Sequence, residues 1–498
     1  MNNMKKLVLV ALLLVGGNVV WAQNSNLLYG STRIPQMNNV NPAFFPTNNS
    51  VYVNGFGLNL NLGLPITLSD VVQTNKQMTD PKTGRTGTYN YIDLNNLMTK
   101  LTENSQINLG MDQYLLGFGF RVLNNFFTVS TQLRMTANVG IPLDVLELLN
   151  EGNANMETGE VRDIDIVNGN LLTSQVYVEL ALGYGIKLGH LTVGARVKPL
   201  IGLYNFTTAN THVTMRTDGD LKHISADAYY QARLSLPIDV EYYEGLTVGN
   251  IGEELQKALK NNQIARPAIG LGVDLGAKYN WNMFEFSASI LDIGRLKWKT
   301  VYDLHPSSGE GAEFVLEGID ITSAIQNQTI NTDSLTAEFK EQLTKLSDAT
   351  VEKGAAYSTG LQTKFNLAAF ANFPTWPKTR AGIVINGTMT PRMLGGGKTR
   401  MMRKNVTLVG SVNLFNWLEV SLSNTIVSNG YRTRVINPGI GINSMIGRSV
   451  QGFILLDYCS LNPTKLNNLN LFMGTNLLFG NKTANTSLLG QNLTEYEL

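Results

Sequence analysis

The chain has 498 residues, of which 15% are charged and 43% hydrophobic, and it carries a formal net charge of +1. Soluble domains contain about 25% charged residues, so this composition is unusual for a soluble enzyme. The balanced charge also gives no field that would hold nucleic acid. The single cysteine, Cys459, excludes an internal disulfide and any multi-cysteine metal site.

The first 22 residues have the pattern of a secretory signal peptide. Two lysines precede an unbroken apolar run over 7–15, and Val20 and Ala22 occupy the small-residue positions before a cleavage site. The run is too short for a membrane anchor, since a spanning helix needs about 20 apolar residues. We therefore expect an exported chain whose mature form begins at Gln23.

Residues 23–50 lack hydrophobic periodicity, and from residue 51 onward apolar and polar residues alternate. The alternation is clearest over 176–188, 191–199 and 269–281, where no charge falls on the apolar face. Because side chains alternate faces along a strand, each segment has one apolar side. Either a soluble sandwich or a membrane barrel would use such strands. Most of these segments exceed the about 5–6 residues of ordinary strands and reach the about 9–11 of tilted membrane strands, which favours the barrel.

We predict an all-β fold: a transmembrane antiparallel β-barrel of 14–16 strands over residues 51–480, followed by a polar tail over 481–498. Short turns are assigned to the periplasmic side and long connections to the outside. Counting 206–216 as a separate strand gives an even number and keeps all short turns on one side. The predicted strands begin near 51, 113, 125, 173, 191, 206, 221, 267, 282, 361, 379, 405, 417, 433, 449 and 468.

Tryptophans and helical patterns add detail to this prediction. Four tryptophans lie at the ends of predicted strands, as interfacial aromatic girdles require, although aromatic residues also cap sandwich cores. Residues 250–260 and 334–346 carry apolar stripes at helical spacing, which predicts short helices in external loops. The four tryptophans are Trp281, Trp298, Trp376 and Trp417.

A family resemblance rests on short motifs in the order expected along the chain. The tripeptide Asn41-Pro42-Ala43, just before the first strand, resembles the N-terminal region of the long-chain fatty-acid transporter (FadL-like) barrels. Segments 194–198 and 289–298 are similar to those of a related Gram-negative group that includes the PorV-type secretion component. The resemblance implies a barrel in the cell outer membrane, with residues 23–50 folded into its lumen as a hatch.

Two groups of residues are candidates for function. Arg196 and Lys198 face the lumen with Lys187 on the adjoining strand; they would either bind a ligand carboxylate or pair with lumenal acids such as Glu179. Asp292 and Gly294 interrupt the alternation of their segment, which indicates a bulge or kink. Such a defect is either purely structural or the site of a lateral opening in the barrel wall.

Motifs for catalysis and nucleotide binding are incomplete. Residues 395–399 imitate the end of a phosphate-binding loop, but Arg392 stands where that pattern needs glycine. This basic loop either contacts anionic lipopolysaccharide or is simply solvated. His223 and Ser225 share a strand face but lie about 6.5 Å apart along it, beyond hydrogen-bond reach, which indicates an ordinary polar row. We expect no enzymatic activity, metal or cofactor.

The leading hypothesis is passive transport or binding of a hydrophobic or amphipathic small molecule. The alternative is a non-enzymatic PorV-like barrel that docks or shuttles secreted proteins. The expected partners are outer-membrane lipid and lipopolysaccharide, with a hydrophobic ligand under the first hypothesis or secretion-system proteins under the second, and no nucleic acid.

Overall fold

The computed structural model describes the chain from residue 25 to residue 480 with internal gaps. Among these residues, no helix is long and apolar enough to cross a membrane. The described ranges are 25–46, 50–79, 86–102, 105–151, 164–217, 223–239, 251–261, 263, 265–306, 312–317, 349–375, 377–391, 393, 400–415, 417–428, 433–434, 437–447, 449–458 and 465–480.

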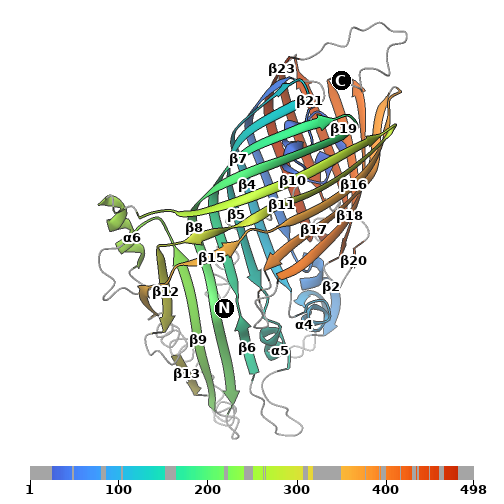
Figure 1. Cartoon of the computed structure of the whole chain (residues 1–498). Coiled ribbons are helices and arrows are strands. Elements are labelled where there is room, and N and C mark those ends of the chain that lie inside the picture. Colours follow the sequence, from blue (N-terminus) through green and yellow to red (C-terminus); the bar gives the residue numbers. More distant parts are fainter. Residues whose placement is uncertain are drawn as a thin grey trace.

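Fourteen strands of the described chain form a closed antiparallel barrel, so the predicted fold class is confirmed (Figure 1). The barrel closes where β23 pairs with β1, from Val51 opposite Phe479 to Gly63 opposite Asn468. The other edge of β1 pairs with β4. A closed barrel leaves no unpaired edge, which is the condition for crossing hydrocarbon with strands. In order around the wall, the strands are β1 (Val51–Gly63), β4 (Gln106–Val122), β5 (Asn125–Gly140), β7 (Leu172–Leu188), β8 (Leu191–Thr217), β10 (Ala268–Trp281), β11 (Phe284–Trp298), β16 (Lys364–Phe373), β17 (Lys378–Pro391), β18 (Arg400–Phe415), β19 (Leu418–Ser428), β21 (Pro438–Ile446), β22 (Val450–Asp457) and β23 (Asn468–Phe479).

The two faces of the wall differ in polarity, as the alternation predicts. On β7, Leu180, Leu182 and Tyr184 are 39%, 48% and 45% exposed on the outer face. Their neighbours Glu179 and Ala181 face inward and are 0% and 1% exposed. This arrangement is the reverse of a soluble sandwich, because the apolar rows point away from the interior.

Exposed aromatic side chains gather beside the short turns. Tyr279, Trp281 and Trp417 are 46%, 56% and 50% exposed there, consistent with an interfacial girdle. The expectation that Trp298 belongs to this girdle is wrong: it lies at the opposite end of β11 and is 1% exposed, within an internal apolar cluster. Trp376 lies outside the described residues.

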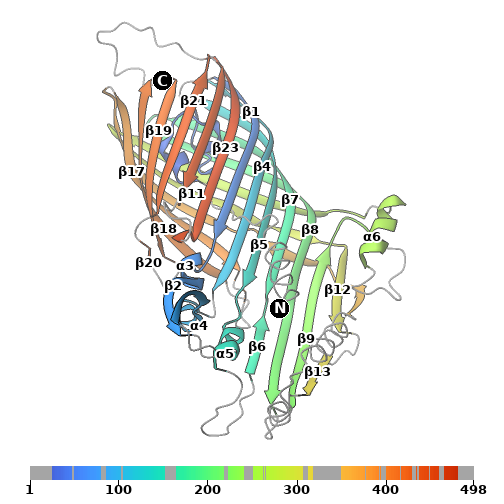
Figure 2. The same ribbon diagram turned by 180° about the vertical axis from the view of Figure 1, so that it is seen from behind.

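One side of the wall continues beyond the barrel as an extended sheet (Figure 2). The prediction of a separate strand over 206–216 is wrong, because β8 runs unbroken to Thr217. It pairs with β10 as far as Gly202 and with β9 from Asn205 onward. No glycine or proline interrupts residues 203–216, so nothing local ends the strand. The predicted strand near 221, β9, also pairs outside the wall. The number of strands in the barrel wall is therefore two lower than the number of predicted strands, and it stays even. The strands outside the wall are β2 (Val72–Thr79), β3 (Thr86–Ile92), β6 (Ile164–Gly169), β9 (His223–Ser235), β12 (Val301–Pro306), β13 (Ala312–Glu317), β14 (Ala349–Lys353), β15 (Tyr357–Gly360) and β20 (Thr433–Arg434).

Short helices lie in the long connections. The helix predicted over 250–260 is present as α6 (Ile251–Lys260), whereas the one predicted over 334–346 lies outside the described residues. The helices α3 (Leu68–Val71), α4 (Leu94–Met98) and α5 (Leu143–Glu151) were not predicted.

Candidate functional site in the barrel interior

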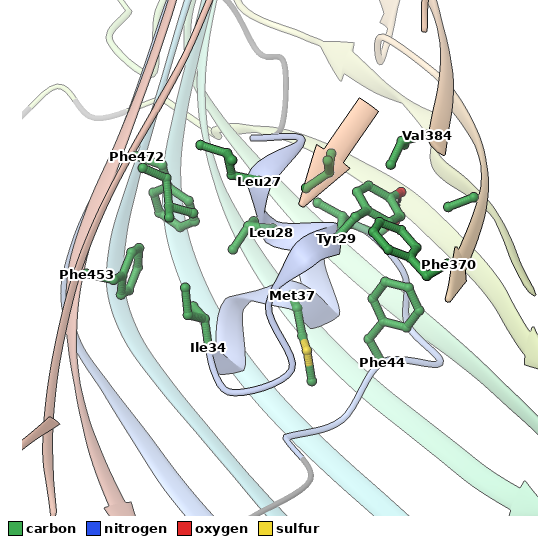
Figure 3. Close-up of a cluster of buried hydrophobic side chains, with 14 of the residues drawn as sticks. Leu27, Leu28, Tyr29, Ile34, Met37, Phe44, Phe370, Val384, Phe453 and Phe472 are labelled. Atoms are coloured by element: carbon green, nitrogen blue, oxygen red, sulfur yellow. Dashed lines mark hydrogen bonds between the residues drawn. The ribbon is translucent and has the colours of Figure 1, made fainter. Parts of the chain in front are cut away.

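The described N-terminal segment, residues 25–46, lies inside the barrel (Figure 3). It contains the helix α2 (Leu27–Gly30) and the 3-10 helix η1 (Pro35–Asn39). Pro35 suits the start of η1, because its fixed φ is preorganised for a helical turn. Leu27 and Ile34 are each 0% exposed. The segment packs against inward-facing apolar side chains of the wall, namely Tyr114, Ala368, Phe370, Val384, Val409, Phe453, Leu455 and Phe472.

Side chains of this segment also hydrogen-bond polar groups of the wall. The four partners stand on four different strands: β22, β18, β19 and β23. The bonds run from Ser25 Oγ to Asp457 Oδ2 (2.5 Å), from Asn26 Nδ2 to Thr407 Oγ1 (2.8 Å), from Ser31 Oγ to Glu419 Oε2 (2.8 Å) and from Gln36 Nε2 to Asn476 Oδ1 (2.7 Å). These strands lie within one arc of the wall, from β18 to β23, so the contacts fix the segment to that arc.

The tripeptide Asn41-Pro42-Ala43 lies against β8, β10 and β11. Asn41 Nδ2 donates to the carbonyl oxygens of Ala277 and Ala288, each at 3.2 Å, and its Oδ1 accepts the Ala43 N–H at 2.9 Å. Two wall glycines permit this approach. A Cβ on Gly276 would come 2.0 Å from Asn41 Oδ1, and one on Gly194 would come 2.2 Å from the Pro42 carbonyl oxygen.

Arg196 and Lys198 lie in a buried ionic network. Arg196 Nη2 is 2.5 Å from Asp274 Oδ2, and its Nη1 donates to Asn39 of the N-terminal segment. Lys198 Nζ is 2.7 Å from both Asp274 Oδ2 and Asp292 Oδ1. Of the two alternatives for this pair, the structure shows pairing with lumenal acids.

Arg134 on β5 is the centre of this network, and the sequence reasoning missed it. Its guanidinium contacts Asp112 at 3.0 Å, Glu179 at 2.9 Å and Asp292 at 2.8 Å. Lys364 Nζ completes the network, 3.7 Å from Asp292 Oδ2. The signal for Arg134 was available, since it is a charged residue on the inward face of an alternating strand.

The network balances four cations with four carboxylates. Each of these side chains is at most 6% exposed. Buried charges are tolerated when they are paired and hydrogen-bonded, and all four carboxylates meet this condition. The members are Arg134, Arg196, Lys198 and Lys364 with Asp112, Glu179, Asp274 and Asp292.

The predicted irregularity at Asp292 coincides with a register shift between β10 and β11. Asp292 has a φ of +58°, and its N–H donates to Asp274 Oδ1 at 2.7 Å. On its other edge, β11 pairs with β16 as far as Leu291 and with β15 from Arg295. Gly294 stands between these pairings, where an added Cβ would come 2.2 Å from the Leu271 carbonyl oxygen. The ionic network thus stabilises a bulge in the wall.

The remaining candidates stay apart from this site. Lys187 lies opposite Thr192 and belongs to no ion pair of the network. His223 and Ser225 lie on β9 in the extended sheet. The basic loop 395–399 and the tail 481–498 lie outside the described residues. Among the described residues, no group of three His, Cys, Asp or Glu could hold a metal ion.

Comparison with known proteins gives a family and distant structural neighbours. The profile of the "Family of unknown function (DUF5723)" matches residues 42–457, and no curated protein matches the chain. The toluene transporter TbuX of Ralstonia pickettii is 8% identical, with 93% of this chain and 97% of that chain covered and a TM-score of 0.43. A FadL homologue of Pseudomonas aeruginosa is 10% identical, with 93% and 100% covered and a TM-score of 0.41. The toluene transporter TodX of P. putida is 10% identical, with 93% and 96% covered and a TM-score of 0.40.

Proposed function

Because the chain belongs to DUF5723, a family of unknown function, we propose a function from the barrel interior itself: passive transport or binding of a hydrophobic or amphipathic small molecule in the outer membrane. The observation that carries this proposal is the position of residues 25–46 inside the lumen. Hydrogen bonds and apolar packing hold the segment there. Such contacts are reversible, so a ligand that competes for them can shift the segment's position.

The segment would act as a hatch over 23–50, with Asn41, Pro42 and Ala43 seated on the wall. A hydrophobic ligand would displace part of the apolar cluster that the segment now fills. The bulge at Asp292 and Gly294 would provide the lateral opening through which the ligand leaves, because the regular pairing of β11 is interrupted there. Export would depend on the leader proposed for residues 1–22.

A reversible disulfide tests the hatch. Asn26 and Thr407 are in side-chain contact, with Nδ2 and Oγ1 2.8 Å apart, so Asn26→Cys and Thr407→Cys would be introduced together in a Cys459→Ser background. Influx of the hydrophobic fluorescent probe N-phenylnaphthylamine into proteoliposomes is measured before and after reduction. We expect at least a tenfold lower influx in the oxidised protein, with recovery on reduction.

The two single-cysteine variants are the matched controls and should behave alike in both redox states. Equal influx through the oxidised and reduced double variant would refute a mobile hatch. If exported proteins copurify with the chain through its extended sheet, and no influx of the probe occurs in either redox state, the result would favour the PorV-like alternative.

A further inference from the structure

An apolar groove crosses the outer face of the wall from β7 to β17. It consists of two hollows of about 670 and 460 Å³, both lined by Ala277, Ala288 and Leu367. Because they share these residues, the two hollows form one continuous groove. Each volume lies within the about 300–1,000 Å³ range of small-molecule sites.

Small residues form the floor of the groove and large residues form its sides. Ala277 and Ala288 stand directly opposite each other on β10 and β11, so two short side chains meet where large ones would fill the space. Around them, Leu275, Tyr279 and Leu367 project from the wall with 49%, 46% and 56% exposure. The order of small and large residues along the outward-facing rows therefore produces the hollow.

Along the strand direction, the groove follows the exposed apolar row of β10. On β10 the exposed apolar row runs from Ile269 to Trp281, and the larger hollow lies at Leu275, midway along it. The smaller hollow continues to Tyr279 and Phe286, beside the aromatic girdle and the short turns. Short turns are periplasmic in barrels of this type, so the groove runs from the centre of the bilayer to its periplasmic interface.

We propose that this groove binds one acyl chain of a phospholipid from the periplasmic leaflet. The groove is part of the lipid-facing surface, and its sides are apolar side chains together with the aromatic rings of Tyr184 and Tyr279. A phospholipid whose headgroup lies at the girdle places its chain along this path, with the methyl end at the bilayer centre. Tyr279, which lines the smaller hollow beside the short turns, marks the polar end, where amphipathic rings are favoured.

The same layer of the wall seats the hatch segment. The carbonyl oxygens of Ala277 and Ala288 accept hydrogen bonds from Asn41 on the inner side, while the alanine side chains form the groove on the outer side. A bound acyl chain therefore packs against the backbone that holds Asn41. Because a ligand that binds only the folded state stabilises it, the phospholipid should raise the unfolding temperature of the barrel.

Retention of palmitoyl-oleoyl-phosphatidylethanolamine after detergent exchange, measured by native mass spectrometry, tests this proposal. Ala277→Phe and Ala288→Phe would each fill the groove, and the smaller Ala288→Val serves if a phenylalanine variant does not fold. Ala381→Phe is the matched control, because Ala381 is also an exposed alanine of the wall but does not line the groove. We expect the unaltered protein and the control to retain one phospholipid and the filled variants to retain at least tenfold less.

Equal retention by the unaltered and filled proteins would overturn the proposal. Retention of lipopolysaccharide in place of the phospholipid would overturn the assignment to the periplasmic leaflet. A second copy of the chain is the remaining possible occupant of the groove. It is tested by oxidising Ala288→Cys, in a Cys459→Ser background, in lipid vesicles. Efficient dimer formation would overturn the lipid proposal in favour of a contact between two copies of the chain. None of these results depends on transport, so they are distinct from a failure of the hatch experiment.

Discussion

Replacing Arg134 with glutamine removes the centre of the ionic network while keeping much of the side-chain volume. Three carboxylates lose a charged partner, but they are not affected equally. Asp292 keeps Lys198 at 2.7 Å, and Glu179 keeps Lys198 at 3.5 Å. Asp112 keeps a hydrogen bond from the neutral amide of Asn59, whose Nδ2 is 3.1 Å from Asp112 Oδ2.

The variant therefore leaves about one uncompensated negative charge at Asp112. Removing one partner of a buried ion pair costs about 3–5 kcal/mol, and we expect the free energy of unfolding to fall by that amount rather than by three times as much. Adding Asp112→Asn restores the balance of charge. The double variant should recover more than half of the loss, since the two residues are in contact and their effects are not additive.

Denaturant unfolding in phospholipid vesicles, followed by tryptophan fluorescence, measures both changes. The single variant Asp112→Asn is the control for the loss of the carboxylate alone. A fall of less than about 1 kcal/mol in the free energy of unfolding of Arg134→Gln would contradict a buried ionic network centred on this residue. A double variant no more stable than Arg134→Gln would contradict it as well.

Two further changes probe the seat of the hatch segment and the outer face. Gly276→Ala would place a Cβ 2.0 Å from Asn41 Oδ1, whereas the Cβ of the control Gly410→Ala meets nothing within 4 Å. The rate of amide exchange over 25–46 should rise at least tenfold in Gly276→Ala and stay unchanged in Gly410→Ala. Equal exchange rates in both variants would refute a close contact between Asn41 and the wall. Leu182→Arg should lower the free energy of unfolding in vesicles by about 2–4 kcal/mol, and Leu188→Arg, near the turn, by about 0–1 kcal/mol. Equal costs at the two positions would contradict a lipid-facing row.

The barrel could be predicted because alternation reports which face each side chain occupies. The same parity located the bulge, since the apolar residues change from even positions, which end at Ile290, to the odd positions of Leu291 and Ile293. Parity gives no stopping point for a strand, however, which is why the continuation of β8 to Thr217 was mistaken for another strand. Trp298 was misplaced because the bulge at Asp292 shifts the alternation of β11, so that this even-numbered position is buried whereas Phe286 and Ile290 are exposed.

Glu179 was predicted as a partner and lies 3.5 Å from Lys198, but the other network partners could not be predicted, because parity does not fix the register of distant strands. Arg134 and Asp292 are 158 residues apart in sequence, and their contact depends on the closure of the whole wall. Inward-facing charges alone favoured internal pairing of Arg196 and Lys198 over ligand binding, but they did not exclude a ligand. The anchoring of the N-terminal segment was equally hidden, because hydrogen bonds such as the one from Asn26 connect irregular backbone to strands far along the chain.

The most direct test of the account is the orientation of the rows on β7. In a background with the native tryptophans replaced by phenylalanine, Leu182→Trp places the fluorophore on the exposed face, and Tyr177→Trp places it on the face that is 3% exposed at that residue. Vesicles of brominated lipid should quench the tryptophan at 182 by more than half and leave the one at 177 nearly unchanged. Equal quenching at both positions, or stronger quenching at 177, would contradict a barrel whose apolar rows face hydrocarbon.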